Sequence, residues 1–214
     1  MVKYEIVHRP FSAVLRVELE EGESVYARRG AFLAGEGSWR ADVRAAGSGA
    51  AWLFRKGSYL LNYFEAGPGG ATLLFAPSAF GDIEAIELYG VCRVHGGAYL
   101  AHHGDVRFGV SVRGLRWWLA GGEFLWLTAA GSGTLWVSAC GGVQQVELDA
   151  GQAVTVDNDY VVAACGYAKW SIAPFGRRAK TFLLSGEGLV LEARGPATLY
   201  LQTRAFRYCG KRVR

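Results

Sequence analysis

An internal repeat is the strongest constraint on the fold of this chain, because its apolar segments recur three times in the same order. Three kinds of segment each appear in three copies, and the offsets between copies lie between 60 and 69 residues. The equivalent residues are Thr72, Thr134 and Thr198 in the first kind, Leu19, Leu88 and Leu148 in the second, and Gly57, Gly122 and Gly186 in the third. Since independent segments share nearly one period, the sequence predicts three copies of one structural unit.

The local pattern within each copy is that of β-strands. Segments such as Leu15–Leu19 and Thr198–Gln202 alternate apolar and polar residues, are five or six residues long and are bounded by glycine-rich turns. This pattern is typical of sandwiches and barrels, and no long window has the 3.6-residue period of a helix. The chain is 51% hydrophobic with 30 glycines. We therefore predict an all-β fold, a β-sandwich of three pseudo-symmetric repeats with little helix.

A single unit of this kind exposes an apolar face and strand edges. We therefore expect three units to bury their faces together around a pseudo-threefold axis. The chain starts inside one copy and ends inside another, so its last strand is expected to complete the first unit. Residues 1–214 are predicted to form one domain of three interlocked repeats, with a short basic tail over residues 205–214.

One stretch resembles a membrane span. Residues 124–146 contain no charge over 23 positions, which is long enough for a transmembrane helix. The centre, Ala129–Thr134, has the glycines and serine of a turn, so we predict two buried strands joined by a turn. The segment Met1–Pro10 is interrupted by charges and lacks the apolar core of a signal peptide. These features predict a cytoplasmic protein without a transmembrane segment, and leave peripheral membrane contact open.

The four cysteines form no metal or redox motif. There is no C-x-x-C among Cys92, Cys140, Cys165 and Cys209, and buried free thiols are the default in an intracellular protein. Arginines outnumber lysines 18 to 5, with two asparagines and one methionine, a composition typical of thermophile proteins. Because intracellular disulfides occur in hyperthermophiles, one or two bridges stay open as an alternative.

Ten segments of the sequence resemble a known family over nearly its whole length, from about Val2 to Arg204. They are Tyr4–Val7, Leu19–Ala27, Gly30–Leu33, Gly81–Ile83, Ala98–Ala101, Gly141–Val143, Val156–Asp157, Val161–Ala163, Gly186–Val190 and Leu201–Arg204. It is similar to the mitochondrial biogenesis family named after altered inheritance of mitochondria, which has many prokaryotic members of unknown function. The resemblance implies a fold similar to the tryptophan RNA-binding attenuator protein, with a double-stranded β-helix-like architecture of three repeats. It implies no catalytic residue and no cofactor.

Three of the four histidines fall in one repeat and are the weak candidates for a metal site. The candidates are His95, His102, His103 and Asp105. Adjacent residues of a strand point to opposite faces, so His102 and His103 are not expected to share a metal. We therefore predict surface or loop histidines in preference to metal ligands, and no cofactor.

A small acidic cluster lies between two predicted strands. It contains Asp149, Asp157, Asn158 and Asp159 but lacks the glycine and the glutamate of a calcium-binding loop. A turn capped by an aspartate side chain is therefore predicted there.

The net charge of +4 is unevenly distributed. Residues 160–214 contain ten basic and two acidic residues, whereas residues 1–159 carry a net charge of −4. A basic end of this kind can bind RNA phosphates or an anionic membrane surface, although a solvated tail is the simpler interpretation. The candidate anion-binding residues are Arg204, Arg207, Lys211, Arg212 and Arg214.

Three function classes are compatible with these observations. The leading hypothesis is a non-enzymatic β-sandwich protein that acts as an oligomeric scaffold or protein-binding module, with a second copy or another protein as partner. The first alternative is an RNA- or anionic-surface-binding module that uses the basic C-terminal region. The second alternative is a metal-dependent enzyme that uses the histidine group.

Overall fold

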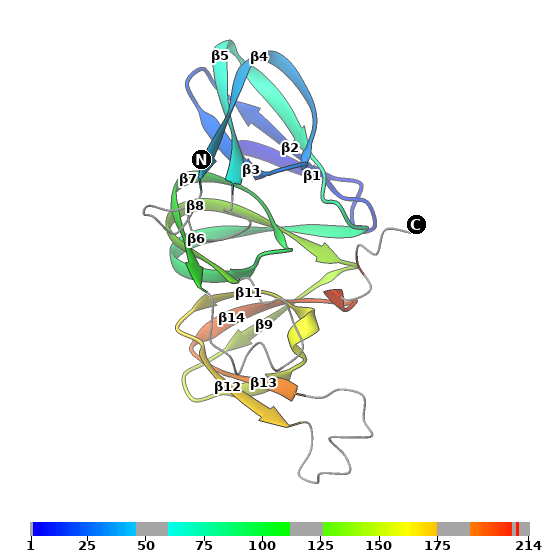
Figure 1. The fold of residues 1–214 in the computed structure, drawn as a ribbon, viewed down its shortest axis with the longest axis vertical. Helices are drawn as coiled ribbons and strands as arrows, with labels where there is room; N and C mark the ends of the chain where they lie inside the picture. The colour runs from blue at the N-terminus through cyan, green and yellow to red at the C-terminus, as the bar shows by residue number, and fades with distance from the viewer. Residues whose placement is uncertain (1, 46–59, 112–125, 175–188, 207–208, 210–214) are drawn as a thin grey trace.

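The protein is almost entirely β-structure in the computed structural model, which describes residues 2–45, 60–111, 126–174, 189–206 and 209. The described residues form fourteen strands and one short 3-10 helix (Figure 1), which confirms the all-β prediction. The strands are β1 (Lys3–Val7), β2 (Val14–Leu19), β3 (Ser24–Arg28), β4 (Phe32–Ala45), β5 (Leu60–Phe75), β6 (Gly81–His95), β7 (Tyr99–Ser111), β8 (Trp126–Cys140), β9 (Val143–Leu148), β10 (Ala153–Val156), β11 (Val161–Gly166), β12 (Lys169–Pro174), β13 (Leu189–Arg194) and β14 (Ala197–Gln202), and the 3-10 helix is η2 (Asn158–Tyr160).

The strands group into three units that repeat the same pairing. We call β1–β5 unit 1, β6–β8 unit 2 and β9–β14 unit 3; they follow one another along the long axis of the molecule (Figure 1). In each unit one strand carries a β-bulge at the equivalent place, in the pairs β4–β5, β7–β8 and β11–β14. The bulges lie between Phe32 and Ala34, between Tyr99 and Ala101, and between Val161 and Ala163. The shared bulge confirms the repeat; the glycines at 57, 122 and 186 lie outside the described residues.

The long strands differ from the expected five or six residues. β5, β6, β7 and β8 have 13 to 16 residues, and β8 runs unbroken through Ala129–Thr134, so the predicted turn there is wrong. Gly131 and Gly133 have positive φ, and a Cβ on Gly131 would collide with the backbone carbonyl oxygen of Asp105. Glycine therefore lets the strand bend sharply without losing its pairing to both neighbours.

Because the long strands bend, each contributes to two half-sheets that pack on each other. In unit 1 the C-terminal half of β5 pairs with β2 in what we call the first half-sheet, and its N-terminal half pairs with β3 in the second half-sheet. The ring centroids of Phe64 and Phe75, one from each half, are 5.4 Å apart in the core. A single bent strand thus builds both layers of its own sandwich.

Neighbouring units are joined by backbone pairing in one register. Between units 1 and 2, β3 pairs with β7, and Ala27 lies opposite Ala101. Between units 2 and 3, β6 pairs with β11, and Val94 lies opposite Ala163. Ala27 and Val94 each lie five residues before the bulge of their own unit, and Ala101 and Ala163 each directly follow the bulge of the next unit. The two pairs therefore occupy the same position in the repeat. The second half-sheet of one unit therefore continues into the first half-sheet of the next.

The units do not close around an axis. The larger sheet follows an open path from β1 to β9, and β10, β13 and β12 form a separate three-stranded sheet. The expectation that the last strand completes unit 1 is also wrong, because β14 pairs with β11 and β9. β13 and β14 correspond to the two halves of β5 and β8, so β14 stays within its own unit.

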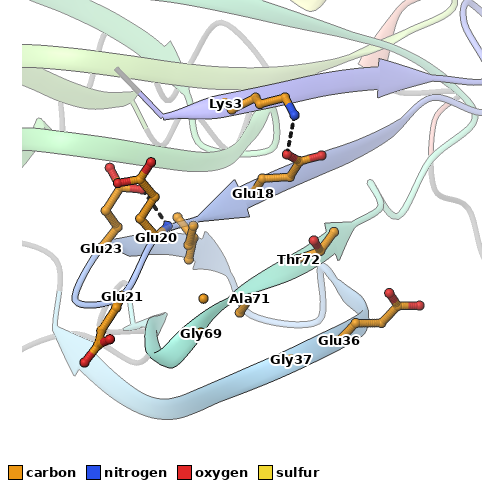
Figure 2. A pocket seen from close by; sticks show the side chains of 12 residues that line it. Lys3, Glu18, Glu20, Glu21, Glu23, Glu36, Gly37, Gly69, Ala71 and Thr72 are labelled. Atoms are coloured by element: carbon orange, nitrogen blue, oxygen red, sulfur yellow. Dashed lines mark hydrogen bonds and ion pairs between the residues drawn. The ribbon is translucent and has the colours of Figure 1, made fainter.

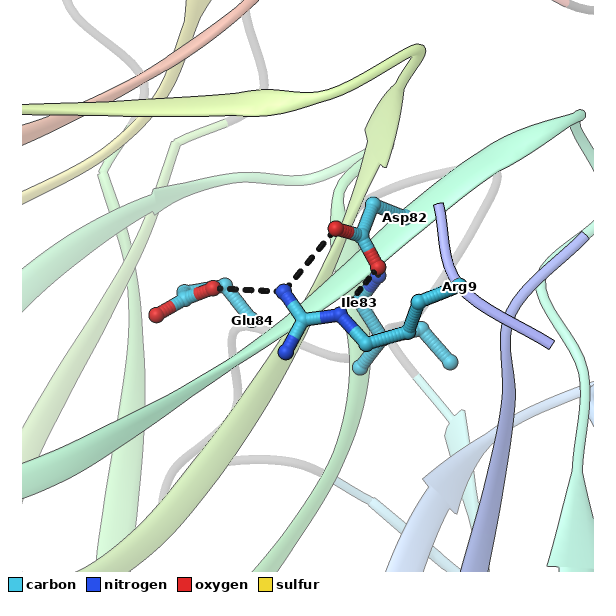
Figure 3. A network of polar contacts seen from close by, with 4 residues as sticks. All are labelled: Arg9, Asp82, Ile83 and Glu84. Atoms are coloured by element: carbon cyan, nitrogen blue, oxygen red, sulfur yellow. Dashed lines mark hydrogen bonds and ion pairs between the residues drawn. The ribbon is translucent and has the colours of Figure 1, made fainter. Parts of the chain in front are cut away.

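A buried carboxylate ties the N-terminal loop to unit 2. Arg9 donates from Nε and Nη2 to the two oxygens of Asp82 at 2.8 and 2.9 Å, and its Nη2 reaches Glu84 at 3.3 Å (Figure 3). The backbone N–H of Ile83 donates to the same Asp82 carboxylate. This fork of charge-assisted hydrogen bonds fixes the loop after β1 on β6.

All four cysteines are paired, so the default expectation of free thiols is wrong. Cys92 bonds to Cys165 across the junction of units 2 and 3, and Cys140 bonds to Cys209. The opposed positions of β6 and β11 bring the first pair together, a long-range pairing that sequence spacing does not reveal.

Candidate functional site

The metal candidates are not brought together. Among the described residues, no group of three or more histidine, cysteine, aspartate or glutamate side chains is placed to hold a metal ion. His102 is buried, whereas His103 Nδ1 lies 2.8 Å from the backbone carbonyl oxygen of Ser24. Asp105 is exposed and lies 3.6 Å from Arg107, and His95 lies at the end of β6.

His102 is instead part of an aromatic stack at the junction of units 1 and 2. Its Nδ1 lies 2.7 Å from the Tyr99 hydroxyl, and its ring stacks on Tyr26 with centroids 4.8 Å apart. Burial, with a smaller contribution from His103, lowers the pKa of His102 to about 3. Burial, followed by the charge of Arg28, lowers the pKa of His95 to about 4. Both imidazoles are therefore neutral at pH 7 and have a packing role here. The prediction of surface or loop histidines is wrong for His102, which is buried within β7 because its ring packs at the junction of two units.

The first part of the expected basic tail is docked on the body of the protein. Arg204 donates its backbone N–H to the carbonyl oxygen of Cys140, and its side chain is exposed. Ala205 is buried, and Phe206 stacks on His95 with ring centroids 4.0 Å apart, so one face of the Phe206 ring is already occupied. The other candidate anion-binding residues, Arg207, Lys211, Arg212 and Arg214, lie outside the described residues.

The acidic cluster before β11 is a capped turn, as predicted. The Asp157 carboxylate accepts a hydrogen bond from the backbone N–H of Asp159 at 2.9 Å and caps η2. The cluster therefore has a structural explanation.

A wide acidic groove of about 800 Å³ lies on unit 1 (Figure 2). Lys3 Nζ approaches Glu18 at 2.6 Å, and this contact lowers the pKa of Glu18. The run of acidic residues around Gly22 is the sequence signal that marks the groove, which our sequence analysis missed. Five glutamates line it: Glu18, Glu20, Glu21, Glu23 and Glu36.

The N-terminal part of β4, Phe32–Gly35, is an open strand edge beside this groove. It pairs with β5 on one side, and no other described strand pairs with it. Its counterparts in β7 and β11 are covered by the preceding unit, through β3 and β6. No unit among the described strands lies before unit 1, so the same position is open there. We call Phe32–Gly35 the β4 edge.

The β4 edge exposes apolar side chains whose counterparts are fully buried. Phe32 and Leu33 are 37% and 54% exposed. The equivalent residues in units 2 and 3 are at most 1% exposed; they are Tyr99, Leu100, Val161 and Val162. Burying a leucine side chain contributes about 1.5–3 kcal/mol. A partner that covers the β4 edge would therefore be stabilised by the burial of Leu33. The repeat in the sequence identifies these residues as equivalent. Their different exposure follows from the fold, in which no described unit covers unit 1 on this side.

A second open edge lies in the unit at the opposite end of the molecule. β10 ends the three-stranded sheet and pairs with β13 alone among the described strands. Its Val154 is half-buried, whereas the equivalent residues Val25 and Cys92 are fully buried under the next unit. β10 is therefore the edge that a fourth unit would cover.

These two edges differ from the others in charge. The β4 edge and β10 contain no charged residue or proline, whereas β1, β9 and β12 contain Lys3, Glu147 and Lys169. Charges on an edge strand discourage pairing with another chain. Of the described strand edges named here, the two uncharged ones are thus the least protected against pairing.

Another pair of exposed aromatic residues lies near the N-terminal loop. Phe11 and Phe80 are 76% and 87% exposed, and a bridge between Ser12 and Gly81 places them on adjoining segments. Both residues lie on loops outside the named strands, so they form a surface distinct from the β4 edge.

Comparison with known proteins agrees with this architecture. The crystal structure of protein SPYM3_0169 from Streptococcus pyogenes has a similar fold, with a TM-score of 0.77 and 24% sequence identity over 97% of this chain and 95% of that chain. A search of curated proteins finds no match. No helix among the described residues is long and apolar enough to cross a membrane. The mitochondrial biogenesis AIM24 family matches residues 4–204, from β1 through β14, and the chain belongs to this family.

Proposed function

We propose that the protein is a non-enzymatic oligomeric scaffold or protein-binding module, and that the β4 edge is its binding surface. The observation that carries this proposal is the exposure of Phe32 and Leu33. Their equivalents in units 2 and 3 are completely buried. An apolar strand edge without charges offers a partner both backbone hydrogen bonds and an apolar surface. The buried histidines and the capped acidic turn have packing roles, which leaves this edge as the strongest feature for function.

The mass of the protein in solution tests this proposal. Light scattering coupled to size-exclusion chromatography across the micromolar range is expected to show a mean mass above that of one chain. The variant Leu33→Lys is expected to weaken the association constant by at least about tenfold, because it removes an apolar contact and places a charge on the edge. Val43→Lys is the matched control, because Val43 lies on the same strand and is also 54% exposed.

The outcomes separate the surfaces. A chain that stays monomeric at every concentration and retains no protein partner contradicts the proposal. If assembly survives Leu33→Lys but is lost in Phe80→Ser, the protein assembles through the loop surface and the assignment of the β4 edge is wrong.

A further inference from the structure

We infer that β10 of one copy pairs with the β4 edge of the next copy, so that chains join head to tail and the three-unit array continues across molecules. The inference deepens the proposed function and rests on it, since it names the partner of the β4 edge as a second copy of this chain. The interface would be heterologous, with a different surface of each copy on its two sides.

The two junctions within the chain define the pairing that a third junction would have. At both, a strand from the second half-sheet of one unit lies antiparallel to a bulged strand from the first half-sheet of the next. The remaining strand of the first kind is β10, and the remaining bulged strand is β4. Among the described strands, β4 and β10 are therefore the members of the series with one open side. They lie on the two end units, and each is the type of strand that the other lacks.

The repeat also fixes the register of the third junction. Val154 pairs with Ala193 on β13, and Cys92 pairs with Ala129 on β8. The two alanines are equivalent because each lies five residues before one of the repeated threonines, Thr198 and Thr134. Val154 is therefore the equivalent of Cys92. Glu36 pairs with Thr72 and Cys165 pairs with Thr198, and these threonines are equivalent in the repeat. Cys92 lies opposite Cys165 at the existing junction. Val154 of one copy should therefore lie opposite Glu36 of the next.

The side chains at this register match the packing of the existing junctions. Leu100 and Val25 lie in one buried apolar cluster at the first junction, and Val162 and Cys92 lie in another at the second. The equivalents at the third junction are Leu33 and Val154, both apolar and both partly exposed in the single chain. Pairing would bury this apolar pair as it does at the other two junctions. Phe32–Gly35 and β10 contribute no charge, and Glu36, opposite Val154, is the charged residue that the register brings to the junction.

An engineered disulfide tests the register directly. The double variant Glu36→Cys/Val154→Cys reproduces between molecules the position of the native Cys92–Cys165 bond. Mild oxidation is expected to give a ladder of dimers, trimers and longer chains on a non-reducing gel, reversed by reductant. The control Glu36→Cys/Thr155→Cys places the second thiol on the other face of β10, and is expected to cross-link at least about tenfold less because its geometry does not suit a disulfide.

A mixing experiment tests the head-to-tail arrangement. Glu36→Cys mixed with Val154→Cys is expected to give dimers that contain one chain of each kind and no longer species, because each single variant supplies one side of the junction. Circular dichroism of each variant checks that it folds. If the two double variants cross-link equally, or folded Glu36→Cys/Val154→Cys gives no ladder, the inference is wrong. Should light scattering still show assembly, the proposed function stands without it; if the protein is also monomeric and partnerless, both fail.

Discussion

Lowering the pH from 7 to 5 is expected to destabilise the protein by an amount set by two buried histidines. In the folded protein the pKa of His102 is about 3 and that of His95 about 4, both lowered chiefly by burial. In the unfolded chain each is near 6.5. The unfolded state therefore binds more protons below pH 6.5, so stability is complete above that pH and is lost as the pH falls. With both sites contributing, the slope approaches about 2.7 kcal/mol per pH unit.

Urea unfolding at several pH values between 7 and 5 measures this slope. Carboxylates add to acid destabilisation mainly below about pH 5, so the upper window reports the histidines. His102→Gln removes one titrating group and is expected to reduce the slope by about half. Tyr99→Phe is the matched control, because it removes the hydroxyl 2.7 Å from His102 Nδ1 but keeps the buried imidazole. A slope that is the same in His102→Gln and the unmodified protein contradicts the burial of neutral His102.

Removing the disulfide between β6 and β11 is expected to lower the free energy of unfolding by about 4 kcal/mol, the chain-entropy value for a closed loop of this length. Cys92 and Cys165 are 73 residues apart in the sequence, so the bond strongly restricts the unfolded chain. The double variant Cys92→Ala/Cys165→Ala leaves only small side chains at the junction, and the backbone pairing of β6 with β11 is retained.

Thiol counting and denaturant unfolding check this expectation together. The unfolded, unreduced protein should react with no thiol reagent, and the double alanine variant should unfold at lower denaturant concentration. Four reactive thiols per chain, with equal stability of the two proteins, would restore the interpretation of free cysteines that the sequence favoured.

The repeat was the part of the fold that the sequence revealed best. The offset of the three threonines placed equivalent strands correctly, because Thr72, Thr134 and Thr198 all lie on the strand opposite a bulge. The length of the strands was predicted poorly, because a Gly-Ser-Gly segment is equally suited to a turn between two strands. Only the pairing of Gly131 and Gly133 with the strands on both sides makes this segment a bend within one strand. Closure around an axis was wrong because pairing between the end units depends on their relative orientation. The likeness to the tryptophan RNA-binding attenuator protein stays a prediction.

The candidate site was less visible in the sequence. Phe32 and Leu33 have the same apolar character as Tyr99 and Leu100, so composition alone treats them all as core. What distinguishes them is the absence of a preceding unit among the described strands, which is a property of the assembled fold. The histidine group drew attention because of its residue types, yet strand geometry separates its members.

Amide hydrogen exchange at two protein concentrations tests most directly whether the open ends of the array are binding surfaces between copies. At high concentration, residues 32–35 and 153–156 are expected to become protected together, while the edge strand β9 exchanges as before. Leu33→Lys should abolish the protection at both places. Exchange that is independent of concentration at both edges, in a protein that assembles, would contradict the account.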